Sequence, residues 1–404
     1  MFLDTVIARN PELVDVAATL HEQGAIPPDT YVVDRDAVAA NAALLAAEAD
    51  RLGLTLWFVV KQLGRNPELI RAVADHIPAY AAIDAGEART LHATGAARPG
   101  NLGHLVQIPR RALPELLAWR PETVTVYDAA NARAVSDAAV DLGLVQDVLV
   151  RIESAPGAGY PGQDGGVPLD GLDAFAHAVE ALPGIRIAGV TAFPCLLCDP
   201  TTGAPHPTPN LTLAIRARQA LAARGHTGLN DRTGQDGRTG LKLSAPSATS
   251  VAALPLLAEH GVTHAEPGHA LTGTTPLHAV DPHQPEKPAY VYVTEVAHTL
   301  ADGRPAVFGG GFYPRARIDS ALLPRTGQRL RVADAPAENI DYYRLLDAPP
   351  PGAPAPRIGD TAVLSFRTQI FVTRSTVAVV AGLSSGAPRL TGLYDAQGRA
   401  LETT

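Results

Sequence analysis

Short apolar stretches alternate with longer amphipathic ones through most of the chain, and this alternation constrains the fold more than any other feature. Leaving aside TYVVD at 30–34, eight stretches read as strands: 54–60, 79–84, 102–108, 123–128, 147–153, 185–193, 240–245 and 262–268. Most neighbouring strands bracket a helical stretch such as RDAVAANAALLAAEADRLG. Apolar strands that alternate with helices form parallel βαβ units. Eight such units predict a (β/α)8 TIM barrel.

An open, doubly wound sheet is the alternative, but no glycine-rich fingerprint opens the first βα unit. After residue 280 the pattern changes, because DPHQPEKP is a proline-rich break and the segments beyond it read as strands with no long helix between them. We therefore predict a barrel domain over residues 1–280 and a smaller C-terminal β domain over 281–404. The N-terminal residues are candidates to pack with the β domain. The polar insertion at 224–240 carries no recognisable chemistry.

Composition excludes several classes of protein. The chain has 404 residues, of which 46% are hydrophobic and 18% charged, as in a folded globular protein. The net charge of −8 predicts no nucleic-acid or anionic-membrane partner. No apolar run reaches the length of a membrane span, and the N-terminus lacks the pattern of a signal peptide. We expect a cytoplasmic protein.

The two cysteines, Cys195 and Cys198, lie together in FPCLLCDP. A four-sulfur metal site would need a second pair, and His206 could add only one further ligand. The pair also does not open a helix, as redox pairs do. We expect thiols that are buried or line a pocket, and no metal site.

Lys61 ends the strand predicted at 54–60 and is one of three lysines, against thirty arginines. A lysine at a strand end can simply cover apolar surface with its stem. However, active sites of such barrels form at the carboxyl ends of the strands. Because this chain uses arginine at nearly every other positively charged position, a lysine at a strand end suggests a role that only an amine can fill. Lys242 begins its strand at the opposite rim and Lys287 lies in the interdomain break.

Two loops at the same end of the predicted barrel suit a phosphate. SAPSATS at 244–250 follows the seventh strand, and GHALTGTT at 268–275 follows the eighth. Hydroxyl groups and backbone N–H groups at a helix start favour an anion, and loops at this position are the usual phosphate site of the fold. Helix capping by Ser and Thr is the simpler explanation of SAPSATS taken alone. Two such loops after the seventh and eighth strands favour a phosphate instead. A lysine that faces a phosphate site suits a Schiff base with pyridoxal 5′-phosphate, because an amine can bond a carbonyl carbon and a guanidinium cannot.

The sequence resembles the fold-type III pyridoxal-phosphate enzymes with an alanine-racemase-like barrel, and especially the YhfX family. The similarity runs end to end and is carried by MFLDTVIARNPELVD, KQLGRNPEL, GHLVQIP, FPCLLCDP, PTPNL, APSATS, VTHAEPGHALTGT, GGGFY, IDYY and FRTQIFVTRS. The resemblance implies cofactor contacts from Lys61 (Schiff base), Asp84, His104, Arg151 (phenolic oxygen), Phe193, Ser247, Thr249, Glu266 (pyridine nitrogen), Gly268 and His269. Position 192 is Ala where some relatives place a ring-stacking histidine, so Phe193 or His104 would cover the cofactor ring.

Racemisation needs two bases, one on each face of the planar carbanion. Lys61 would be one of them. In alanine racemases the other is a tyrosine of the partner subunit's β domain, which makes Tyr313, Tyr342 and Tyr343 candidates here, with Tyr313 favoured. Cys195 is a further candidate base. Arg367 and Arg374 are the candidates to hold the substrate carboxylate through a bidentate contact.

The leading hypothesis is a pyridoxal-phosphate racemase or epimerase of a small amino acid or analogue. It would act as a homodimer with its sites at the interface. A lyase on the same scaffold (decarboxylase, aldolase or dehydratase) and a non-catalytic pyridoxal-phosphate carrier are the alternatives. A metal-dependent hydrolase using His264, Glu266 and His269 is disfavoured, because the Pro and Gly within HAEPGH prevent the helix that such ligand spacing needs.

Overall fold

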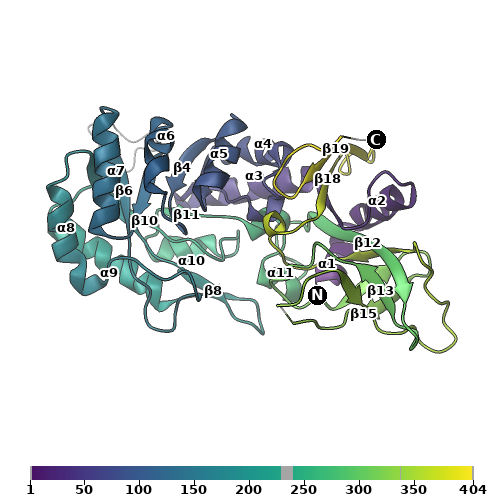
Figure 1. Ribbon diagram of the computed structural model, residues 1–404. Coiled ribbons are helices and arrows are strands. Elements are labelled where there is room, and N and C mark those ends of the chain that lie inside the picture. Colours follow the sequence, from purple (N-terminus) through teal and green to yellow (C-terminus); the bar gives the residue numbers. More distant parts are fainter. Residues whose placement is uncertain (1, 229–239, 337, 403–404) are drawn as a thin grey trace.

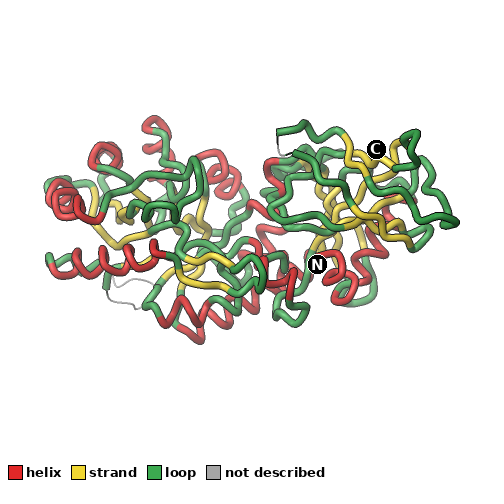
Figure 2. Tube along the Cα trace, turned by 90° about the horizontal axis from the view of Figure 1, so that it is seen from below, coloured by secondary structure: helices red, strands yellow, loops and turns green. Residues whose placement is uncertain are grey.

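The computed structural model describes residues 2–228, 240–336 and 338–402, so most of the insertion predicted at 224–240 lies outside the described residues. The chain forms two lobes (Figure 1). One lobe is a barrel ringed by helices, and the other is built mainly of strands, with both chain ends on its side. A second view shows the same division, with most of the helices around the barrel (Figure 2).

Eight parallel strands form the barrel, in the order β2-β11-β10-β7-β6-β5-β4-β3. Their bounds are Thr55–Leu56 (β2), Ala79–Ala82 (β3), Arg98–Leu102 (β4), Thr123–Val126 (β5), Gln146–Arg151 (β6), Ile185–Thr191 (β7), Lys242–Ser244 (β10) and His264–Ala265 (β11). The ring closes just beyond β2, where Phe58 forms a parallel bridge with Tyr80. The predicted eight-stranded parallel barrel is thereby confirmed.

Helices cover the barrel between successive strands. They are Arg35–Leu52 (α3), Pro67–Ala74 (α4), Ala85–Ala93 (α5), Leu113–Ala118 (α6), Ala129–Asp141 (α7), Leu172–Glu180 (α8), Pro209–Ala223 (α9) and Leu254–Glu259 (α10). The sequence sets their ends: the Asp34 side chain accepts from the backbone N–H groups of Asp36 and Ala37 to begin α3, and Gly53 ends it in the left-handed conformation. No helix in the described part of the chain combines the length and apolar character needed to cross a bilayer.

The second sheet has the order β15-β14-β17-β12-β1-β18-β19, with β13 and β16 branching from β12. Its strands are Thr30–Asp34 (β1), Tyr290–Thr299 (β12), Pro305–Phe308 (β13), Ser320–Leu323 (β14), Gln328–Arg331 (β15), Tyr343–Leu345 (β16), Thr361–Leu364 (β17), Thr376–Ala381 (β18) and Arg389–Asp395 (β19). β1 lies between β12 and β18, and helices Phe2–Arg9 (α1) and Pro11–Glu22 (α2) pack an apolar core on the sheet. The N-terminal residues thus belong to this sheet, whereas the boundary after residue 280 stays a prediction.

The third barrel strand was predicted wrongly at 102–108, because β4 spans Arg98–Leu102 and His104 lies in the loop after it. The letters RPGNL suggest a turn. In the structure, Gly100 is needed within the strand because a Cβ there would meet the Trp57 indole at 2.2 Å. A contact with a residue far away in the sequence therefore decides the position of this strand.

At the amino ends of the strands, the Glu122 carboxylate is surrounded by three basic side chains. His264 Nε2 and Lys242 Nζ each lie 3.3 Å from its carboxylate, and Arg98 lies 3.2 Å away. Burial alone would raise the pKa of Glu122, but the hydrogen bond and charge of His264, with Lys242 and Arg98, outweigh burial and bring it to about 2. Lys242 and His264 are therefore occupied at the end of the barrel away from the predicted site.

We predict that Glu122→Gln lowers the free energy of unfolding by about 3 kcal/mol at pH 7. The folded state favours the carboxylate, so this stabilisation is complete above the usual pKa of 4.5 and is lost as the pH falls towards 2. Urea unfolding of the parent and variant at pH 7, 4 and 3 measures the difference. A difference that grows as the pH falls would contradict this account.

Candidate active site

A cavity of about 320 Å³ opens between the carboxyl ends of the barrel strands and loops of the strand-rich lobe. Its polar and charged lining residues are Lys61, Gln62, His104, Tyr160, Gln163, Ser247, Thr249, Glu266, His269, Thr275, Tyr313, Arg315, Arg367 and Gln369. The barrel supplies residues as far as Thr275, and the other lobe supplies the rest. Parallel strands carry these side chains to one end of the barrel, so segments far apart in the sequence meet there.

Lys61 stands where the extended segment after β2 turns into the short 3₁₀ helix Lys61–Leu63 (η1), which ends at the left-handed Gly64. Its side chain lines the cavity. Burial lowers the pKa of the Lys61 amine, with Glu87 and Glu266 opposing the shift and Arg315 and Arg367 adding to it. A lowered pKa increases the neutral, nucleophilic fraction of an amine. The position suits covalent chemistry better than a surface lysine would.

Glu266 follows β11 and is buried in the same cavity. Burial raises the pKa of its carboxyl group to about 7, against the opposing effects of Lys61, Asn101 and Arg151. Its Oε1 atom has no hydrogen-bond partner among the described residues, and its Oε2 atom lies 4.0 Å from His104 Nε2. A buried carboxyl group with a free oxygen is positioned to meet a ring nitrogen of a bound group.

His104 and Phe193 form one wall, with their rings in edge contact at 5.7 Å between centroids. Burial lowers the pKa of His104 well below its usual value, and Arg151 and Lys61 add to this effect, so the ring is neutral. Neither ring nitrogen has a partner among the described residues. Arg151 is fully buried behind this wall and donates to the carbonyl oxygens of His104 and Gln163 at 3.2 and 3.3 Å.

The backbone of the loop after β10 is strained. Ser247 and Ala248 both have positive φ, at +96° and +51°, which residues with a side chain rarely adopt. The Thr249 hydroxyl is buried and has no hydrogen-bond partner within the described chain. The Ser247 hydroxyl group donates a hydrogen bond of 2.8 Å to the Leu196 carbonyl oxygen.

The facing loop begins at Gly268, where a Cβ would lie 2.7 Å from the Gln62 side-chain oxygen, so a larger residue would displace that side chain. His269 Nε2 has no hydrogen-bond partner in the described part of the chain. Burial lowers the pKa of His269 well below its usual value, and Arg367 adds to the shift. Together with the loop after β10, these groups fit a phosphate held mainly by neutral donors.

Several residues considered from the sequence do not line the cavity: Arg151, which lies behind its wall, the tyrosines Tyr342 and Tyr343, and Asp84, Cys195 and Arg374. The Asp84 side chain caps α5 by accepting from the Glu87 N–H at 2.7 Å and lies 3.5 Å from Arg65, because the helix start directly follows its strand. Cys195 is fully buried with its Sγ on the Ala192 carbonyl oxygen, and burial raises its thiol pKa to about 12. Arg374 donates to the Asp341 carbonyl oxygen outside the cavity.

Among the tyrosines, Tyr313 lines the cavity with 41% of its surface exposed. Tyr343 instead packs its ring against His298 and Phe308, and Tyr342 is exposed outside the cavity. Sequence reasoning missed Gln62, Tyr160, Gln163, Arg315 and Gln369 as lining residues. Arg315 stands two residues after Tyr313, which was a usable signal, whereas Tyr160 and Gln163 lie in a long loop without periodicity.

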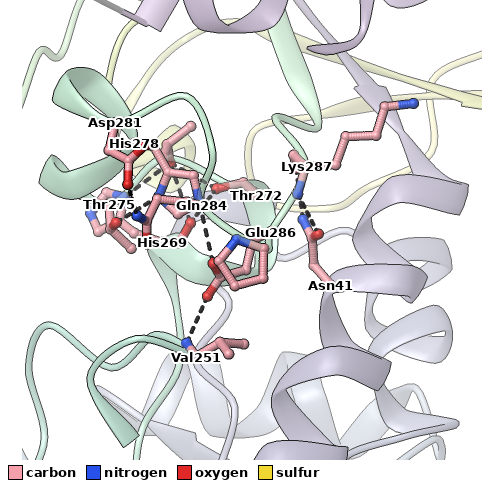
Figure 3. A network of polar contacts seen from close by, with 12 residues as sticks. Asn41, Val251, His269, Thr272, Thr275, His278, Asp281, Gln284, Glu286 and Lys287 are labelled. Carbon is pink, nitrogen blue, oxygen red and sulfur yellow. Dashed lines mark hydrogen bonds and ion pairs between the residues drawn. The ribbon is translucent and has the colours of Figure 1, made fainter.

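A buried polar network ties the phosphate loop to the interdomain segment (Figure 3). Glu286 Oε1 accepts from the Val251 N–H at 2.8 Å, and its Oε2 lies 3.4 Å from His278 Nε2. His278 Nδ1 in turn lies 2.6 Å from the hydroxyl of Thr275, which lines the cavity. One residue along, the backbone of Lys287 exchanges hydrogen bonds of 2.7 and 2.8 Å with the Asn41 side chain of α3. Glu286 therefore positions the loop after β10 from behind.

The arrangement does not support the metal-hydrolase alternative. The His264 ring packs against Trp57 at a tilt, with 4.4 Å between the ring centroids, and His264 Nε2 lies 3.3 Å from Glu122. His264 is thus engaged at the other end of the barrel from Glu266 and His269. No group of three or more His, Cys, Asp or Glu side chains in the described chain could hold a metal ion.

Comparison with known proteins decides the family. The family model described as alanine racemase, N-terminal domain, matches residues 33–276, and the model described as YhfX-like, C-terminal domain, matches residues 291–390. Over 402 residues the chain is 38% identical to the uncharacterized protein YhfX of Escherichia coli (strain K12), covering 99% of this chain and all of that protein. The chain belongs to the alanine-racemase-like, fold-type III pyridoxal-phosphate family.

Solved structures share the fold at low identity. A D-threonine aldolase from Filomicrobium marinum matches with a TM-score of 0.64 at 17% identity, covering 92% of this chain and 95% of that chain. An alanine racemase from Corynebacterium glutamicum matches with a TM-score of 0.59 at 20% identity, covering 84% and 90%. For D-threo-3-hydroxyaspartate dehydratase from Delftia sp. HT23 the TM-score is 0.62 at 17% identity, over 89% and 95%.

The cofactor of this family is pyridoxal 5′-phosphate, as predicted. The cavity fits it, because the Lys61 amine, a carboxyl group with an unpartnered oxygen and a strained loop with an unpartnered hydroxyl group all line one space. The individual contacts inferred from the resemblance stay predictions.

We predict that Glu286→Ala destabilises the protein by roughly 2 kcal/mol, because the part-buried Val251 N–H loses its acceptor and the buried His278 loses its acidic neighbour. Urea unfolding measures this change. Glu286→Gln retains an acceptor for the N–H and should lose less than half as much. Equal stability of the Ala variant and the parent would contradict the positioning role.

Proposed function

We propose that the protein is a pyridoxal-phosphate-dependent racemase or epimerase of a small amino acid or analogue. The observation that carries the proposal is the convergence of Lys61, Glu266 and Tyr313 on one cavity. Lys61 offers an amine with a lowered pKa, and Tyr313 offers a hydroxyl group from the opposite lobe of the same chain. Two proton-carrying groups that approach from different sides are what inversion at a carbon requires.

When bound, the cofactor supplies an electron sink that acidifies the substrate's α-hydrogen. Lys61 would hold the cofactor through its amine, and this amine would take or return a proton on one face of the substrate. Tyr313 would serve the other face. Glu266 would hold the pyridine nitrogen, where its carboxylate would favour a proton. Thr249, Gly268 and His269 would bind the phosphate, and the rings of His104 and Phe193 would exclude water from the site.

A lyase remains the second candidate, because the structural relatives named above include an aldolase and a dehydratase. A racemase exchanges the α-hydrogen with solvent and leaves the carbon skeleton intact. An aldolase or a dehydratase breaks a bond at the β-carbon. Product analysis by NMR in D₂O separates the two.

The proposal includes a homodimer that acts in the cytoplasm. Support for the dimer is the resemblance to alanine racemases. The exposed face of Tyr313 at the cavity edge leaves room for a second subunit to cover the mouth.

We expect the purified protein to be yellow, and borohydride reduction to fix the cofactor on Lys61. Lys61→Arg should abolish both the visible absorption and the labelled peptide, because a guanidinium does not form the bond. The matched control is Lys287→Arg, which keeps its colour because Lys287 lies outside the cavity. Mass mapping of the reduced peptide measures the outcome. A label on any other lysine would sink the proposal.

We predict that Tyr313→Phe slows α-hydrogen exchange of one enantiomer by about 10²- to 10⁴-fold, the usual contribution of a general acid or base. Exchange of the other enantiomer at its α-carbon should persist, because Lys61 still serves that face. ¹H NMR in D₂O on each enantiomer measures both rates. Tyr343→Phe, outside the cavity, is the control and should leave them unchanged. Equal loss for both enantiomers would argue against a two-base mechanism.

A further inference from the structure

Two arginines of the strand-rich lobe face the cavity without an acidic partner. Arg315 and Arg367 both line it, and neither forms a salt bridge with a described residue. Their backbones are linked, because the Arg315 N–H donates to the Arg367 carbonyl oxygen at 2.7 Å. Arg367 Nη1 donates only to the Arg315 carbonyl oxygen, at 3.3 Å, and its Nε has no partner in the described chain.

The two guanidinium groups repel one another. Burial lowers the pKa of Arg367, and the charge of Arg315 lowers it further. Both arginines also lower the pKa of Lys61 and of His269, so their fields reach across the cavity. Glu266 is the only acid among the lining residues that the structure describes, and it is paired in charge with Lys61. The mouth of the cavity therefore carries an excess of about two positive charges, which favours anionic ligands.

The cofactor's phosphate does not account for this excess. The phosphate-shaped loops come from the barrel and offer backbone N–H groups, the Thr249 hydroxyl and a neutral His269. Arg315 and Arg367 approach from the other lobe, alongside the exposed Tyr313. Arg367 is partly buried, whereas Arg315 is exposed to solvent. A single α-carboxylate would occupy one of the two guanidinium groups and leave the donors of the other available to a second anion.

We propose that the substrate carries two acidic groups: an amino acid whose side chain ends in a carboxylate or an equivalent anion, held by Arg315 and Arg367. This inference rests on the proposed function, because it names the substrate class of that same site. A planar guanidinium binds a carboxylate through two parallel hydrogen bonds, so one arginine is available for each group. Arg315 and Arg367 thereby select for charge as well as size.

The test compares ligands of one shape that differ in charge, on the protein loaded with its cofactor. Aspartate should exchange its α-hydrogen with a kcat/KM about 10- to 100-fold above that of asparagine or alanine. Succinate, which has no amine to react, should bind in a calorimeter at least about tenfold more tightly than its monoamide succinamate. The second readout does not depend on turnover.

Substitutions assign the effect to the two arginines. Arg315→Gln and Arg367→Gln should each remove most of the preference for aspartate and for succinate, and should keep the visible absorption of the cofactor. Lysine at either position should restore part of the preference. Arg374→Gln is the matched control, because Arg374 belongs to the same lobe but its guanidinium group donates to the Asp341 carbonyl oxygen and does not line the cavity. It should behave as the parent does.

Each contrary outcome has its own meaning. Loss of the bound cofactor in the Gln variants would show that the arginines hold the cofactor's phosphate, and would overturn the inference. Equal exchange of asparagine and aspartate, or equal binding of succinate and succinamate, would overturn it while leaving the racemase proposal intact. A protein that takes up no cofactor on Lys61 would instead refute the proposed function itself.

Discussion

The parallel pairing of eight strands in a closed ring is the constraint on which the site depends. Parallel strands start at one end of the barrel and finish at the other, so the segments that follow β2, β10 and β11 meet around one opening. The ring closes through the Phe58–Tyr80 bridge, directly before Lys61 in the chain. The hydrogen bonds that complete the barrel therefore also hold the backbone that carries the reactive amine.

Charge is divided between the two ends of this barrel. At the amino ends, the Glu122 carboxylate contacts Lys242 and Arg98 and has a pKa of about 2. At the carboxyl ends, burial brings the pKa of Glu266 to about 7, and Arg315 and Arg367 line the cavity without an acidic partner among the described residues. The first arrangement stabilises the fold, whereas the second leaves guanidinium donors available to a bound anion. For this reason we assign a stabilising role to the amino ends of the barrel strands and a binding role to their carboxyl ends.

The two lobes are interlocked rather than joined by a simple linker. β1 leaves the N-terminal helices, crosses the centre of the second sheet and continues into α3 of the barrel. Glu286 and His278 then connect the returning chain to the loop after β10 (Figure 3). The strand-rich lobe can for this reason place Tyr313, Arg315 and Arg367 at the cavity of the same chain.

The sequence by itself determined the barrel and placed Lys61 and the two loops at 244–250 and 268–275 at one end of it, because periodicity and strand ends are local properties of the chain. That these loops bind phosphate stays a prediction. The resemblance of the sequence to a known family determined the cofactor. Only the tertiary structure decided where β4 lies, since that depends on Gly100 meeting Trp57. The tertiary structure also shows that Asp84 caps a helix and that Cys195 is buried in the core. The direction of a side chain, and the arrival of Arg315 and Arg367 from another lobe, depend on contacts between residues hundreds of positions apart, which no local pattern records.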